Sequence, residues 1–175
     1  MVLLATTTGA SPVTTLLSRA TDAVWQARCA LVGSGELQLG KDIELRPSFG
    51  KGMGVFALRD IPVETVLSRY SGQLYSVAEF EQALLADETT GDYAFQVIPG
   101  WVVDGEDPER SSWSRYVNHS MRRQNCHAFS GPGYIYLEAI QDIPKGSELF
   151  FDYGDAYWTD RAPETSWRRL AVDLL

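Results

Sequence analysis

The segment Asn118-His119-Ser120 places an amide, an imidazole and a hydroxyl in consecutive positions. His119 could serve as a general base and Ser120 as a nucleophile. A hydrolase would also need an acid that orients the histidine, and the sequence places none beside it. A zinc site is poorly supported, because His119, Cys126 and His127 lack the usual ligand spacing. From these residues alone, a histidine held in a polar loop is the simplest interpretation.

A second candidate site is the run Gly50-Lys51-Gly52-Met53-Gly54. Its three glycines allow the backbone to approach a ligand closely and to expose N–H groups. The spacing of a phosphate-binding P-loop, with its Lys-Ser/Thr pair, is absent. From these residues alone, a purely structural turn is therefore favoured over a ligand-binding loop.

The elements that would position these residues are mainly short strands. Strand composition occurs at 43–46, 53–58, 63–70, 93–98, 101–103, 134–140 and 148–151. Ser76-Val77-Ala78-Glu79 is a capping-box sequence that predicts a helix through about Leu85. Residues 155–173 favour one or two short helices. The fold class predicted is mainly β with peripheral helices.

The N-terminal region has a different composition. Residues 1–35 hold one acid and are rich in Ser and Thr, which is also typical of an organellar transit peptide. Over 12–32, apolar residues recur at helical spacing and predict an amphipathic helix. They are Val13, Leu16, Leu17, Ala20, Ala23, Val24, Ala27, Ala30 and Leu31. We therefore divide the chain into an N-terminal extension (1–40), a central domain (41–158) and a C-terminal helical segment (159–175).

Composition restricts the class of partner. The 175 residues carry a formal net charge of −8, which argues against a dedicated nucleic-acid binder. The charge fits a basic partner as well as simple solubility. No apolar run reaches the length of a membrane span. Two cysteines are too few for a disulfide framework and favour a reducing, intracellular compartment.

Three segments taken together resemble a known family. Gly50–Ala57, Arg115–Ser120 and Glu148–Gly154 occur in the order and spacing of SET-domain protein lysine methyltransferases. The resemblance covers about residues 42–158 and is closest to compact SET proteins, including the small viral type, without Cys-rich flanking segments. It implies small sheets and a C-terminal pseudoknot, with residues 159–175 closing the site.

The resemblance also implies roles for individual residues. Tyr153 would be the catalytic residue, and Phe151, Tyr93 and Tyr157 would line the substrate channel. Asn118 would contact the amino-acid end of S-adenosylmethionine. The implied cofactor-binding set is Lys51, Gly52, Met53, Gly54, Tyr70, Arg115, Asn118, His119, Tyr153 and Trp158. No metal is implied.

The activity implied by the resemblance is S-adenosylmethionine-dependent methylation of lysine side chains in a protein or peptide, with histone tails as the first candidate. Phe151 occupies the position where SET enzymes carry Phe or Tyr, and Phe favours di- or trimethyllysine as product. The alternative is a catalytically inactive SET module that binds peptides or proteins. The nucleus or cytoplasm is the expected location, with an organelle as the alternative, and no direct contact with nucleic acid or membrane is expected.

Overall fold

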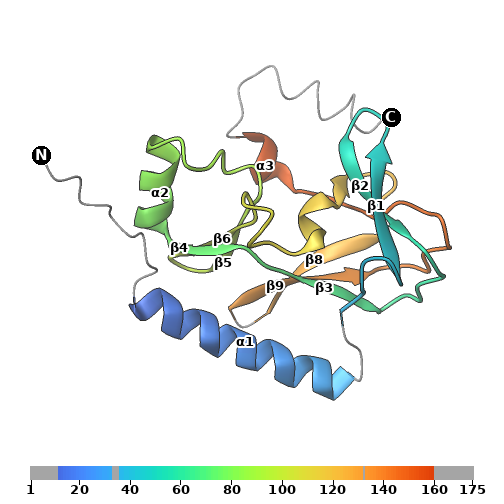
Figure 1. Ribbon diagram of the computed structural model, residues 1–175, viewed down its shortest axis with the longest axis horizontal. Helices are drawn as coiled ribbons and strands as arrows, with labels where there is room; N and C mark the ends of the chain where they lie inside the picture. The colour runs from blue at the N-terminus through green and yellow to red at the C-terminus, as the bar shows by residue number, and fades with distance from the viewer. Residues whose placement is uncertain (1–11, 33–35, 132, 160–175) are drawn as a thin grey trace, which may run out of the picture.

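Short strands make up most of the regular structure in the computed structural model, which describes residues 12–32, 36–131 and 133–159 (Figure 1). This confirms the mainly β class predicted from the sequence. The strands are β1 (Ile43–Ser48), β2 (Gly52–Ala57), β3 (Val66–Tyr70), β4 (Gln73–Ser76), β5 (Ala94–Ile98), β6 (Trp101–Asp104), β7 (Asn118–His119), β8 (Cys126–Gly131), β9 (Tyr134–Ala139) and β10 (Phe150–Phe151). The helices are α1 (Pro12–Val32), α2 (Val77–Leu85), the 3₁₀ turn η1 (Trp113–Tyr116) and α3 (Asp155–Thr159).

The strands form several small sheets. β1 and β2 are an antiparallel hairpin, and the two three-stranded antiparallel sheets have the orders β3-β9-β8 and β4-β6-β5. The strand expected from Val63 begins only at Val66, because Glu64 has a φ of 65° and cannot continue an extended strand. The strands β4, β7 and β8 were not predicted.

A buried core joins the hairpin to the β3-β9-β8 sheet. Leu67, Leu137 and Leu149 are fully buried at its centre. The side-chain amide of Asn125 donates to the carbonyl of Glu148 at 2.7 Å and accepts the N–H of Phe150 at 2.9 Å. One buried side chain therefore fixes the backbone that leads into β10.

Two distant segments meet beside this core. β7 pairs in parallel with β10, with Asn118 opposite Phe150 and His119 opposite Phe151. The N–H of Ser120 extends the pairing to the carbonyl of Phe151 at 3.2 Å. The segments that the resemblance joins in a C-terminal pseudoknot therefore lie side by side.

Helix α1 lies across the face of the β3-β9-β8 sheet (Figure 1). The helix itself is confirmed, but its predicted apolar stripe does not form the buried side: Val13 is 63% and Leu16 is 71% exposed. The buried face instead centres on Trp25, which is 3% exposed and meets Tyr134 edge-on at 5.2 Å. One indole buries more apolar area than several alanines, and this selects the face.

The polar contacts of α1 select the same face. The guanidinium of Arg69 on β3 pairs with the carboxylate of Asp22 and donates to Thr21 Oγ1 at 3.2 Å.

Within the described part of the chain, no helix is both long enough and apolar enough to cross a membrane.

Helix α2 starts as its sequence predicts. Ser76 Oγ accepts the N–H of Glu79, and the Glu79 carboxylate accepts the N–H of Ser76 at 2.8 Å. This helix packs on the β4-β6-β5 sheet (Figure 1). Of the predicted C-terminal helices, α3 is present, and residues 160–175 lie outside the described residues.

Candidate active site

Tyr153 lies between β10 and α3, where the chain leaves the core. Its hydroxyl donates to the carbonyl oxygen of Val117 at 3.0 Å, and its backbone N–H donates to Nδ1 of His119 at 3.2 Å. Its ring contacts Phe151 and Tyr157, at centroid distances of 4.8 and 4.7 Å. Burial raises the pKa of the phenol above its ordinary value, with a smaller contribution from Tyr157. Tyr153 is therefore a fixed, neutral hydroxyl.

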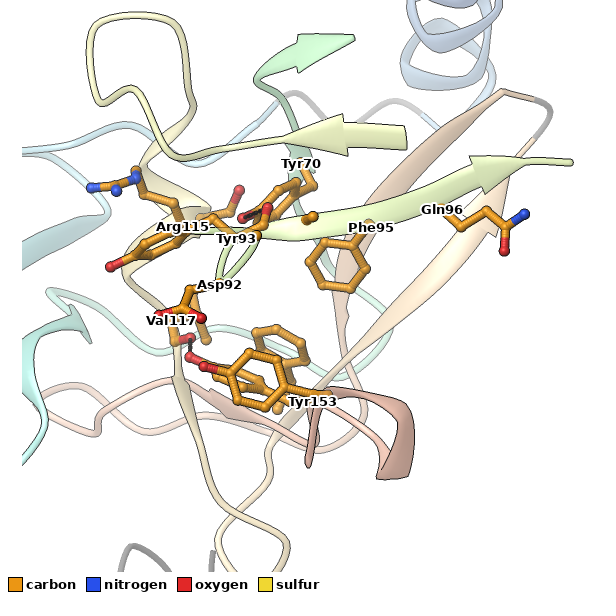
Figure 2. A pocket seen from close by; sticks show the side chains of 13 residues that line it. Tyr70, Asp92, Tyr93, Phe95, Gln96, Arg115, Val117 and Tyr153 are labelled. Atoms are coloured by element: carbon orange, nitrogen blue, oxygen red, sulfur yellow. Dashed lines mark hydrogen bonds between the residues drawn. The ribbon is translucent and has the colours of Figure 1, made fainter. Parts of the chain in front are cut away.

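A pocket of about 320 Å³ lies against the Tyr153 ring (Figure 2). Six of its thirteen lining residues are aromatic, and among the lining residues Asp92 is the only carboxylate and Arg115 the only cation. Gln96 points away from the enclosed space (Figure 2). The aromatic residues are Tyr70, Tyr93, Phe95, Phe151, Tyr153 and Tyr157. The predicted channel residues Phe151, Tyr93 and Tyr157 are thus brought together.

Arg115 fixes one wall of this pocket. Its Nε donates to the carbonyl of Gly105 at 2.6 Å and its Nη2 to that of Glu106 at 2.9 Å, while its guanidinium lies 4.2 Å from the Tyr93 ring centroid. The Tyr70 hydroxyl donates to the carbonyl of Tyr93 at 2.9 Å. Arg115 and Tyr70, both expected to bind cofactor, therefore line the pocket with the channel residues.

The glycine turn (residues 50–54) meets the Asn-His segment (Asn118 and His119) on another side of Tyr153. Nζ of Lys51 donates to the carbonyl of His119 at 3.2 Å, and Nδ2 of Asn118 donates to the carbonyl of Met53 at 3.1 Å. Gly52 has a φ of 76°, a conformation that favours glycine over other residues. Together with Gly54, these predicted cofactor-binding residues form one cluster.

His119 and Ser120 do not form a hydrolytic pair. Nδ1 of His119 accepts the N–H of Tyr153, and Oγ of Ser120, whose residue is fully buried, accepts the N–H of Arg123 at 3.1 Å. A serine without access to solvent cannot attack an external substrate. In the described residues no group of three or more His, Cys, Asp and Glu side chains is placed to hold a metal.

Helix α3 contacts both regions. Tyr157 lines the pocket, while the Trp158 ring meets His119 edge-on at 5.1 Å. The indole N–H of Trp158 is buried and has no acceptor among the described residues. Consecutive residues of one short helix thus cover the pocket and the Asn-His segment.

The sequence did not identify several residues of this arrangement. Phe95 stacks on Phe151 at 6.1 Å, and Val117 supplies the acceptor for Tyr153. Glu148 accepts hydrogen bonds from Ser48 and Asn118, both at 2.9 Å. Val117 and Glu148 lie inside the motif segments, so their position was the available signal. Phe95 carried none beyond its strand composition.

The order of these segments and their assembly around Tyr153 match a known domain: the SET domain family model covers residues 52–154, more than half of the chain. The chain belongs to the SET-domain family. It is similar to the N-lysine methyltransferase KMT5A-A of Danio rerio, with 36% identity over 115 residues, which is 61% of this chain and 33% of the relative.

Two further relatives carry related names. The histone-lysine N-methyltransferase set-17 of Caenorhabditis elegans is 33% identical over 111 residues, covering 61% of this chain and 38% of the relative. The histone-lysine N-methyltransferase 2D of Homo sapiens is 29% identical over 109 residues, covering 59% of this chain and 2% of the relative. The chain therefore spans well under half the length of these relatives.

Proposed function

We propose that this SET domain transfers methyl groups from S-adenosylmethionine to lysine side chains of proteins. The observation that carries the proposal is the position of Tyr153. Its ring lines the pocket, and its backbone N–H donates to Nδ1 of His119. His119 belongs to the polar cluster formed by the glycine turn and the Asn-His segment. A tyrosine between a pocket with many aromatic residues and a separate polar cluster suits a reaction between two ligands that enter from different sides.

The polar cluster has groups that fit the cofactor. Oδ1 of Asn118 has no hydrogen-bond partner among the described residues, because both side-chain contacts of this amide involve Nδ2. It can therefore accept from an ammonium group. The buried indole N–H of Trp158 offers a donor, and its ring offers an aromatic surface for a base. The glycine turn allows close approach of the backbone.

The reaction requires alignment more than acid–base chemistry. When bound, S-adenosylmethionine would supply an electrophilic methyl on a sulfonium: attack on the methyl carbon by a neutral lysine nitrogen forms the N–C bond, breaks the S–C bond and releases the sulfur as a neutral thioether. The aromatic wall excludes water and, by desolvation, lowers the pKa of the entering amine. The proton of the Tyr153 hydroxyl is engaged by Val117, which leaves the oxygen lone pairs to orient the amine.

The proposed substrate is a lysine-containing protein or peptide, with histone tails tested first. Two of the relatives are named histone-lysine N-methyltransferases, and the net charge of −8 suits a basic partner. Phe151 lines the pocket without a polar atom, so we propose di- or trimethyllysine as product. The proposed location is the nucleus or cytoplasm.

The test is incubation of the protein with methyl-labelled S-adenosylmethionine and separate histone and proteome pools, followed by mass spectrometry of labelled peptides. Label on lysine that depends on intact Tyr153 is the expected result. If the protein binds peptides from the pools but transfers no label, it is a peptide-binding SET module instead. Calorimetry that detects no binding of millimolar cofactor would also reject the enzyme.

A further inference from the structure

Glu148 connects three segments around the glycine turn. Its Oε2 accepts the hydroxyl of Ser48 at 2.9 Å, and its Oε1 accepts Nδ2 of Asn118 at 2.9 Å. Its backbone forms an isolated bridge with Phe56 on β2. Ser48 ends β1 and Asn118 begins β7, so one carboxylate ties the β1–β2 hairpin to the Asn-His segment.

Gly54 is shaped to admit this carboxylate. A Cβ atom at Gly54 would lie 2.3 Å from Oε1 of Glu148 and 3.0 Å from Cβ of Ser48. Such distances are far inside van der Waals contact, so no larger residue fits while Glu148 keeps its position. The third glycine of the turn therefore has a packing reason that is separate from any ligand.

Glu148 also fixes the orientation of the Asn118 amide. The carbonyl of Met53 and Oε1 of Glu148 are both acceptors, and both face Nδ2 of Asn118. Only the NH₂ end of the amide can face two acceptors. The two N–H groups are thereby used within the protein, and Oδ1 is the end that remains for a ligand.

We propose that Glu148 is a positioning residue that holds Asn118 with its Oδ1 acceptor presented to a donor group of the bound cofactor. This inference rests on the proposed binding of S-adenosylmethionine at the cluster. Glu148 acts through Asn118 and need not touch the ligand. Without the carboxylate, only the carbonyl of Met53 still holds the NH₂ end, so the amide is fixed less firmly and can more often present N–H groups, which repel an ammonium group.

The first measurement is cofactor affinity by calorimetry, using Glu148→Ala, Glu148→Gln and Ser48→Ala. Glu148→Ala should weaken cofactor binding by roughly ten- to hundredfold. This is the range for losing one hydrogen bond to a charged group, here the bond between Oδ1 of Asn118 and the ammonium group of the cofactor. Glu148→Gln should largely restore affinity, because its carbonyl can still accept from Asn118 while the Ser48 hydroxyl turns to accept from the new NH₂. Ser48→Ala removes the other contact of Glu148 and should leave affinity within about twofold of the wild type, the size of a half-kcal/mol change in free energy.

The second measurement uses the free protein and does not depend on cofactor. The side-chain NH₂ protons of Asn118 in the NMR spectrum should be shifted downfield in the wild type and in Ser48→Ala, and the proton that faces Glu148 should lose that shift in Glu148→Ala, while the proton that faces Met53 keeps most of it. An unchanged Asn118 signal in Glu148→Ala would overturn the proposal, as would Ser48→Ala weakening cofactor binding as much as Glu148→Ala. A wild type that binds no cofactor but keeps the NMR response would overturn the proposed function and the ligand-facing role, while upholding the hold of Glu148 on Asn118.

Discussion

The hydroxyl of Tyr153 donates a 3.0 Å hydrogen bond to the carbonyl oxygen of Val117, the residue immediately before β7. This bond crosses between two segments that are 36 residues apart and holds the hydroxyl at the pocket wall. Because the hydroxyl of Tyr153 donates its proton in a hydrogen bond to a backbone carbonyl, the phenolic oxygen can act toward a ligand only as an acceptor. It can therefore receive an amine N–H or make weak C–H···O contacts with a methyl group.

The first prediction is that Tyr153→Phe lowers turnover by about one to three orders of magnitude, as expected for losing one positioned polar group at a reacting centre. The ring contacts with Phe151 and Tyr157 remain, so stability should fall only by about 1 kcal/mol, the worth of one hydrogen bond. Single-turnover rates and thermal melts measure the two effects. A near-normal rate in the variant would place the catalytic tyrosine elsewhere.

The second prediction concerns pH. Burial raises the pKa of Tyr153, so its phenol stays neutral throughout the range below its usual value of about 10. Activity should rise with pH as the substrate lysine loses its proton, and should not fall through ionisation of Tyr153 below about pH 10. The measurement is kcat/KM against pH for the wild type and Tyr153→Phe. The two profiles should have the same shape, whereas loss of the rising limb in the variant would make Tyr153 the base.

Local signals explain what the sequence predicted well about the fold. The capping box at Ser76 and Glu79 needs only neighbouring residues, and it placed the start of α2 correctly. The strands β4 and β8 were missed because their stability comes from pairing with β6 and β9, which the sequence of either strand does not reveal. The buried face of α1 was missed for a similar reason. It depends on the contact between Trp25 and Tyr134, a residue of β9 that is distant in the sequence.

The site shows the same limit. The resemblance implied that residues 50–54 and the pair Asn118 and His119 bind one cofactor, and the hydrogen bonds of Lys51 and Met53 join these two segments. The motifs did not predict that Arg115 would donate a hydrogen bond to the carbonyl of Gly105, ten residues earlier, because that contact depends on where this carbonyl lies in three dimensions. The cofactor roles of Arg115 and Tyr70, like those of the other predicted site residues, stay predictions.

The third prediction tests the aromatic cover. Trp158→Ala should weaken cofactor binding by about three- to tenfold, because it removes the ring that meets His119 edge-on, and aromatic contacts of this kind are worth about 0.5–1.5 kcal/mol. Trp158→Phe is the matched control and should retain most of the affinity. Calorimetry with the demethylated product of the cofactor is the measurement. Equal affinity in the wild type and Trp158→Ala would assign Trp158 to packing alone.

The fourth prediction concerns α1. Trp25→Ala should lower the free energy of unfolding by about 3–5 kcal/mol, the usual cost of truncating a large buried aromatic residue. Leu16→Ala on the opposite face should change it by less than about 0.5 kcal/mol, as for an ordinary surface position. Denaturant unfolding followed by fluorescence of the remaining tryptophans compares the two. A larger loss for Leu16→Ala than for Trp25→Ala would show that the apolar stripe is the buried face in solution.

The fifth prediction concerns the product. Phe151 is 3% exposed, lies 4.8 Å from the Tyr153 ring and lines the pocket that would receive the lysine. A hydroxyl at this position could hold a water beside the lysine nitrogen, in the space that a further methyl group needs. Holding or displacing one ordered water costs about 0–2 kcal/mol, which is enough to change the dominant product. Phe151 has no polar atom to hold that water, so the wild type should proceed to di- or trimethyllysine.

Phe151→Tyr should therefore shift the product toward monomethyllysine while the first methyl transfer keeps its rate. The measurement is a mass-spectrometric time course on one lysine peptide with excess cofactor. Phe95→Tyr is a matched control, because it adds a hydroxyl to another ring of the same pocket, stacked on Phe151 at 6.1 Å. If the effect belongs to position 151, the control should change the product distribution less. A wild type that stops at one methyl would contradict the prediction, since Phe151 would then not be the residue that sets the product.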